Sequence, residues 1–157
     1  MPERQSVPPS VVTVRAVSRT VVAALAPEEL PDLEVRMTAY EESPSALRKA
    51  VRRSDAPGGS GAAPLLTTGV ITAVDAALTK IAQDITGGAA KGRGRLWRRR
   101  RAVAAVPLEA LDTAELEQAR EAALAAARRT GLRPRRAELI ADATVGALIH
   151  TRRGSRS

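Results

Sequence analysis

The residues with the strongest chemical character form a basic run at residues 91–101, KGRGRLWRRRR. Seven of its eleven residues are Lys or Arg, and Trp97 is the only tryptophan of the chain. A guanidinium group binds a phosphate through two parallel hydrogen bonds, and an indole ring stacks on an unpaired base. The run therefore favours a nucleic acid as partner. In this interpretation Trp97 stacks on a base or wedges between bases. The residues that contact phosphates are Arg93, Arg95, Arg98, Arg99, Arg100 and Arg101.

Two other interpretations of the basic run stay open. Leu96 and Trp97 lie among basic residues, which suits an anionic membrane surface where each basic side chain contributes about 1 kcal/mol. The basic run can also be a solvated linker whose charge repels other cations and keeps the protein in solution. A binding surface is favoured only if these side chains share a face with other basic residues.

Catalytic motifs are missing from the sequence. There is no cysteine and only one histidine, His150, which excludes thiolate chemistry, Cys-based zinc sites and a His cluster. No Walker, nucleophile-elbow or HExxH motif occurs, and the Gly-rich stretches lack the strand-then-helix context of a phosphate loop. We expect a non-enzymatic protein with no catalytic residue, no metal, no cofactor and no small-molecule substrate.

Positive charge is concentrated in the second half of the chain. Residues 1–86 carry 9 basic and 10 acidic side chains (net −1), and residues 87–157 carry 16 and 7 (net +9), which together give the chain's +8. This asymmetry indicates an anionic partner for the second half. The first ten residues lack the basic start and apolar run of a secretory signal, so we expect a cytoplasmic protein.

The N-terminal unit, residues 1–54, is expected to be helical. Between residues 10 and 27 the VVTV stretch favours a strand, but the apolar residues recur at helical steps of three and four. We expect a helix there, capped by Ser10, with an apolar side of Val14, Val17, Val21 and Leu25.

Two more helices are expected in this unit. A short one covers residues 45–53 and would bury Leu47 and Val51. The other covers residues 27–43 and has acidic residues at its start, where they interact favourably with the helix dipole. Its apolar side consists of Leu30, Leu33, Met37 and Tyr40.

A flexible Gly/Ser linker at residues 55–64 precedes an amphipathic helix at residues 65–86. Asp75 and Lys80 would each cost about 2.5–3.5 kcal/mol near the centre of a membrane span, so we expect no membrane span there. The apolar stripe steps by three and four, which favours packing on another helix, of a partner protein or of a second copy. The stripe consists of Ile71, Val74, Leu78, Ile81 and Ile85.

A helical hairpin at residues 107–150 has the clearest local signals. Asp112 and Glu115 form a capping box, and Leu111 and Leu116 occupy the positions of a hydrophobic staple. A helix therefore begins at Thr113 and runs to residue 129. A basic linker at residues 87–106 precedes the hairpin, and a basic tail at residues 151–157 follows it.

The turn of the hairpin is marked by Gly131 and Pro134. Glycine suits the left-handed position after a helix, and proline suits the first turn of the next one. The second helix, at residues 134–150, is expected to have an apolar side that includes small residues, which permit close approach to the first helix. The apolar side consists of Leu139, Ile140, Ala143, Ala147 and Leu148, and the small residues are Ala143, Gly146 and Ala147.

A second basic cluster surrounds this turn. The spacing of Ala127, Gly131 and Ile140 resembles a helix-turn-helix, which would aim the cluster at base edges or phosphates. The exposed side of the second helix lacks Asn, Gln and Ser, the usual partners of bases, so a plain antiparallel hairpin is preferred. The cluster consists of Arg128, Arg129, Arg133, Arg135 and Arg136.

The layout resembles uncharacterised small helical proteins of high-GC actinobacteria. The likeness lies in 22-VAALAPEELPDLE-34, 40-YEESPSALRKA-50 and 131-GLRPRRAELIADATVGAL-148, about a quarter of the chain. It implies no known activity and no functional residues. In such proteins the middle is often more apolar and looks like a membrane segment, and this chain departs from that at Asp75 and Lys80.

Together these patterns predict an all-α, Ala-rich fold of five to six helices that ends in the capped hairpin. The expected function is a non-enzymatic binding or scaffold role in which the basic C-terminal half contacts an anionic partner, nucleic acid first. The alternative is a membrane-surface or assembly protein that uses the helix at residues 65–86 and the basic run.

Overall fold

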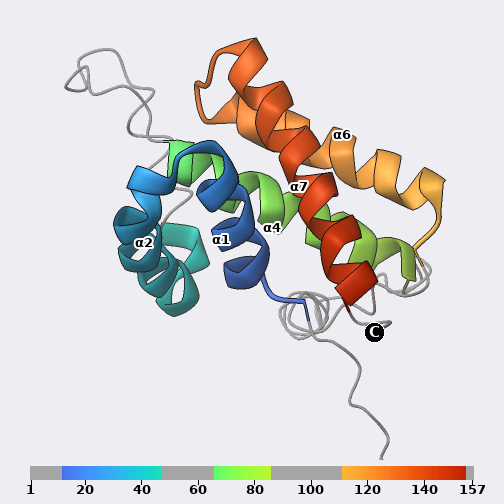
Figure 1. Cartoon of the computed structure of the whole chain (residues 1–157), viewed down its shortest axis with the longest axis horizontal. Coiled ribbons are helices and arrows are strands. Elements are labelled where there is room, and N and C mark those ends of the chain that lie inside the picture. The colour runs from blue at the N-terminus through green and yellow to red at the C-terminus, as the bar shows by residue number, and fades with distance from the viewer. Residues whose placement is uncertain (1–11, 47–65, 86–110, 155–157) are drawn as a thin grey trace, which may run out of the picture.

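Helices make up most of the described part of the chain. The computed structural model describes residues 12–46, 66–85 and 111–154, in which there are six helical elements and no strand (Figure 1). The prediction of an all-α fold with five to six helices is confirmed. The expected helix at residues 45–53 and the linkers at residues 55–64 and 87–106 lie wholly or largely outside these residues. The elements are α1 (Val14–Leu25), the 3-10 helix η1 (Pro27–Glu29), α2 (Leu30–Glu42), α4 (Leu66–Ile85), α6 (Thr113–Arg129) and α7 (Pro134–Gly154).

Helix α1 begins later than the sequence suggested. Thr13 has an extended backbone, and its hydroxyl accepts a hydrogen bond from Ala16 N at 3.1 Å, so Thr13 is the cap. The assignment of Ser10 as the cap is therefore wrong, because the helix does not reach that far. The helical interpretation of the valine-rich stretch is correct from Val14 onward, and the predicted Val17 and Val21 are each 1% exposed.

Helix α2 packs its predicted apolar side inward. Leu33 and Met37 are buried, and Leu30 and Tyr40 pack partly buried against the same core. An ion pair joins α2 to α1, since Arg15 binds Glu34 and also donates to both carboxylate oxygens of Glu41 at 3.0 and 2.8 Å. The hydrogen bond from Arg15 lowers the pKa of Glu41 below its ordinary value.

Helix α4 is the centre of the fold. It contacts α1, α2, α6 and α7, and Figure 1 shows it running behind α1 and α7. Apolar residues outside the predicted stripe, Val70, Ala73 and Ala77, are also 0% exposed, so α4 is buried on more than one side. Four residues of the stripe are 0% exposed as well and pack inside this chain's own core: Ile71, Val74, Leu78 and Ile81. Ile85 ends the helix.

The start of α4 is capped by a residue from another element. Glu29 of η1 accepts two hydrogen bonds at its Oε2, from Thr67 N at 2.9 Å and from Thr67 Oγ1 at 2.6 Å. The first backbone N–H groups of a helix have no partner within the helix, and Thr67 is 0% exposed. Next to this cap, Arg36 of α2 donates to Thr68 Oγ1 at 3.0 Å. The helix therefore depends on η1 and α2 for its N-terminus.

The hairpin signals are confirmed. Asp112 Oδ1 accepts from Glu115 N, and Glu115 Oε2 accepts from Asp112 N, both at 2.8 Å. Gly131 has φ 77°, the left-handed conformation that glycine adopts without strain. Helix α7 continues past the predicted residue 150 to residue 154, and near its end Arg152 Nη1 donates to the backbone oxygen of Leu111 at 2.8 Å.

The close approach of helices occurs at a glycine other than the predicted one. Gly146 is exposed and a Cβ there would meet nothing within 4 Å, so its expected packing role is wrong. Leu139, at 56% exposure, is also not on the buried side. A Cβ on Gly69 of α4 would lie 2.3 Å from Leu132 Cδ1 and 3.3 Å from Ile140 Cδ1. The absent side chain at Gly69 lets α4 pack directly on the hairpin turn.

One hydrophobic core unites the described residues. It contains residues of α1 and α2 from the first half of the chain together with residues of α4, α6 and α7 from the second half. Helix α1 also contacts α7 directly (Figure 1). The helical units on either side of residues 55–64 thus share their apolar interior.

Candidate anion-binding surface

The arginines around the hairpin turn are all exposed. We call Arg128, Arg129, Arg133, Arg135 and Arg136 the turn cluster; two end α6, one precedes α7 and two lie in its first turn. The backbone between them is held in place by Thr130, which is 5% exposed and donates from Oγ1 to Ala127 O at 2.7 Å. Leu132 is 7% exposed. Because these two anchor the turn inward, the neighbouring arginines point to solvent.

The members of the turn cluster differ in their carboxylate partners. Arg128 Nη2 lies 3.7 Å from Glu138 Oε1, a loose ion pair between α6 and α7. For the other four arginines, no carboxylate of a described residue lies within ion-pairing distance. An exposed guanidinium group without such a partner keeps its hydrogen-bonding capacity for an external anion.

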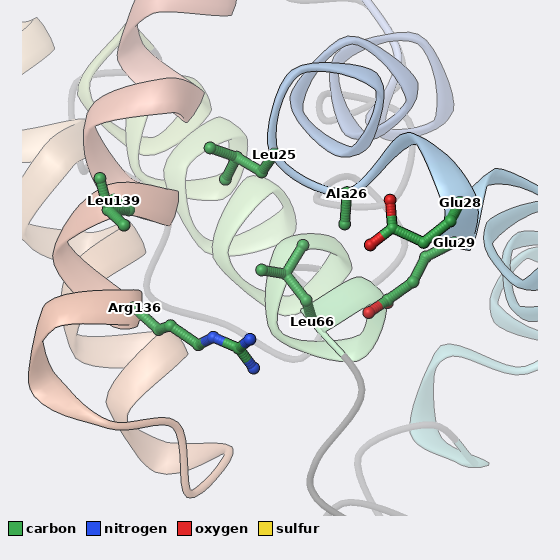
Figure 2. A pocket seen from close by; sticks show the side chains of 7 residues that line it. All are labelled: Leu25, Ala26, Glu28, Glu29, Leu66, Arg136 and Leu139. Atoms are coloured by element: carbon green, nitrogen blue, oxygen red, sulfur yellow. The ribbon is translucent and has the colours of Figure 1, made fainter.

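Arg136 lies beside a small cavity that contains carboxylates. Figure 2 shows its side chain extending from α7 toward Leu66, with Glu28 and Glu29 on the far side. The cavity has a volume of about 150 Å³, and its other lining residues are Leu25, Ala26 and Leu139. Glu28 and Glu29 weaken the positive potential near Arg136. The positive potential of the turn cluster is therefore strongest at Arg129, Arg133 and Arg135.

Beyond its first turn, α7 carries negative charge on its exposed side. Glu138 and Asp142 are exposed, and Asp142 Oδ1 accepts a hydrogen bond from Arg120 Nε of α6 at 2.6 Å. This hydrogen bond raises the pKa of Arg120. No Asn, Gln or Ser lies among the exposed residues of α7. The helix therefore presents arginine at its start and carboxylates in the two turns that follow.

The other predicted functional residues lie either outside the described residues or elsewhere in the fold. The basic run, with Arg93, Arg95 and Trp97, lies outside the described residues, as do Arg98, Arg99, Arg100 and Arg101. The four described residues of the α4 stripe are in the core. His150 is exposed near the end of α7.

Metal-binding and membrane-spanning features are missing from residues 12–46, 66–85 and 111–154. No three His, Cys, Asp or Glu side chains there come together as a metal site would require. None of the helices in these ranges has the length and apolar character needed to cross a membrane.

Two features of this region had no local signal in the sequence. Glu29 binds Thr67 across 38 positions of the chain, and the contact between Gly69 and Leu132 joins residues still further apart.

Comparisons with protein-family models, with curated proteins and with solved structures found no match to this chain.

Proposed function

We propose that this chain is a non-enzymatic binding or scaffold protein whose basic C-terminal half contacts an anionic partner, with nucleic acid favoured. The supporting observation is the turn cluster, in which Arg129, Arg133 and Arg135 are exposed and pair with no described carboxylate. Guanidinium groups bind phosphate oxygens with paired hydrogen bonds, which suits a polyphosphate backbone.

The expected strength of this contact follows from counterion release. Each neutralised DNA phosphate contributes about −0.9 to the slope of log K against log salt. Three free arginines therefore contribute a slope of about −2.7, which is a loss of about 40-fold in affinity between about 50 and 200 mM salt. The basic run would add to this if it contacts the same partner.

The membrane or assembly alternative is weakened by the core. It requires the apolar side of the helix at residues 65–86, but Ile71, Val74 and Leu78 of α4 are fully buried against this chain's own helices. At the hairpin turn the large apolar residue, Leu132, is also buried. Near the turn cluster, Leu139 of α7 is an exposed large apolar residue, and one such side chain is a small anchor for a membrane surface.

The test is a titration of the full chain against a short DNA duplex, a short RNA and anionic vesicles, at about 50 and 200 mM salt. Two variants are compared with the parent: Arg129, Arg133 and Arg135 replaced together by Ala, and Arg98, Arg99, Arg100 and Arg101 replaced together by Ala. Circular dichroism verifies that each variant keeps its helices.

Two single-arginine variants form a matched pair, one in the turn cluster and one on α1. Arg133→Ala should lower the salt slope by about 0.9, whereas Arg19→Ala should leave it unchanged. Arg19 is on α1, its side chain is 69% exposed, and it lies 3.8 Å from Glu34. If nucleic acid is not bound at moderate salt, or if neither multiple variant weakens binding, the proposal is wrong. Binding to vesicles alone would favour the membrane alternative.

A further inference from the structure

The exposed side of α7 changes sign within two helical turns. Arg135 lies in the first turn, Glu138 follows three residues later and Asp142 seven residues later. At a rise of 1.5 Å per residue, the carboxylates stand about 4.5 and 10.5 Å along the axis from Arg135. The positive surface of the turn cluster therefore extends little beyond the first turn of α7; the other arginines of this helix, Arg152 and Arg153, lie in its last turn.

This short distance conflicts with the geometry of base readout. The major groove of DNA is about 8.5 Å deep, so a helix entering by its end would insert about six residues. From Arg135 such an insertion would bring Glu138 between the two phosphate backbones, where it is repelled by both. A helix lying along the groove would bring Asp142 there as well.

Apart from its arginines, the turn itself offers no side chain that can reach a base. Between Arg129 and Arg133 the chain contains Thr130 and Leu132, which are buried, and Gly131, which has no side chain. No aromatic residue is present at this turn to stack on a base. Besides the arginines, Pro134 is exposed at this end of the hairpin, and it has no group that hydrogen-bonds a base.

We infer that the hairpin end binds nucleic acid end-on through its phosphates, with no preference for base sequence, and that Glu138 limits the affinity. This inference rests on the proposed function, since it assigns the mode of contact of the same surface. Phosphate contacts are identical for every sequence, so binding energy is uniform across sequences. Glu138 opposes that contact twice, by repelling phosphate and by engaging Arg128.

The test is a set of DNA duplexes of equal length and different sequence, titrated with the full chain at about 100 mM salt. The dissociation constants should agree within about threefold, because phosphate contacts carry no sequence information. Arg133→Ala should weaken binding to every duplex by a similar factor. Glu138→Gln should tighten binding to every duplex by about two- to threefold, the effect of one screened charge repulsion in water.

The control for the carboxylate is Glu117→Gln. Glu117 is exposed on α6 and lies eleven residues before Arg128, about 16 Å along the helix and beyond the screening length of about 10 Å. This variant should bind as the parent does.

Three outcomes overturn the inference. If affinities differ by more than about fivefold between sequences, bases are read, since a single good base contact contributes at least about 1 kcal/mol of discrimination. If Glu138→Gln binds no tighter than the parent, the carboxylate does not face the phosphates. If no duplex binds at all, the proposed function is wrong and this inference is wrong with it. If the duplexes bind but either of the first two outcomes is found, only this inference is wrong.

Discussion

Replacement of Gly69 by alanine tests the close approach between α4 and the hairpin turn. The new methyl group would lie 2.3 Å from Leu132 Cδ1, 3.3 Å from Ile140 Cδ1 and 3.4 Å from Thr130 Oγ1. Ile140 is 0% exposed and has no room to move, whereas Leu132 lies near the surface at 7% exposure and can shift its end methyl. The substitution therefore forces the side chain of Leu132 to shift.

Two opposing terms set the size of the effect. Alanine is favoured over glycine in a helix interior by about 1 kcal/mol, because glycine loses more backbone freedom on folding. Excess volume in a packed core costs about 1–3 kcal/mol. Gly69→Ala should thus change the free energy of unfolding by between about zero and a loss of 2 kcal/mol.

Gly146→Ala is the matched control, because it is the same substitution within a helix at a place where nothing lies within 4 Å. It should stabilise the protein by about 0.5–1 kcal/mol. The two variants should consequently differ by about 1–3 kcal/mol, which is the packing term alone. Urea unfolding followed by circular dichroism at 222 nm measures this difference, which corresponds to a separation of about 1 M in the midpoints.

A double substitution locates the source of the difference. In a Leu132→Ala background the clash is removed, so Gly69→Ala should lose most of its cost and the two sites should couple by about 1–3 kcal/mol. If Gly69→Ala and Gly146→Ala stabilise the protein equally, the helix and the turn are not in tight contact and the reasoning is refuted.

Three further predictions concern the caps and the ion pairs. Glu29→Ala should destabilise the protein by about 1–2 kcal/mol in urea unfolding, because Thr67 N and its buried hydroxyl lose their acceptor; an equal stability would contradict the cap. Asp112→Ala should cost about 1 kcal/mol by the same measurement, and Asp112→Asn should cost less since it keeps an accepting oxygen. The folded state lowers the pKa of Glu41 from 4.5 through its hydrogen bond with Arg15, so this contribution is full above 4.5 and is lost as the pH falls through the lower folded value. Glu41→Gln should therefore destabilise the protein more at about pH 7 than at about pH 2.5, and an equal effect at both would contradict the assignment.

Local signals in the sequence predicted the hairpin closely. The capping box needs only Asp112 and Glu115, three residues apart, and the left-handed turn needs only Gly131. Such interactions are formed within one turn of chain, so neighbouring residue types determine them. The exposure of the turn cluster was equally predictable, because arginine is rarely buried without a partner.

The errors lie where distant elements decide the outcome. Leu139 was assigned to the buried side of α7 because it is large and apolar, but α7 packs against α1 and α4 as well as α6, and these contacts select another side of the helix. The stripe on α4 was expected to have one packed face, whereas neighbours surround the helix. The cap from Glu29 depends on how η1 lies against α4, which no local pattern encodes.

Because α4 lies at the centre of the fold, the order of synthesis determines which apolar surfaces are exposed during translation. Helices α1 and α2 are synthesised before the helix that covers them, so apolar side chains such as Val21, Leu33 and Met37 stay open to solvent until α4 follows. Helix α4 in turn remains partly uncovered until α6 and α7 are complete. The nascent chain therefore exposes a growing apolar surface during translation, and this surface closes only when its last helix has been made.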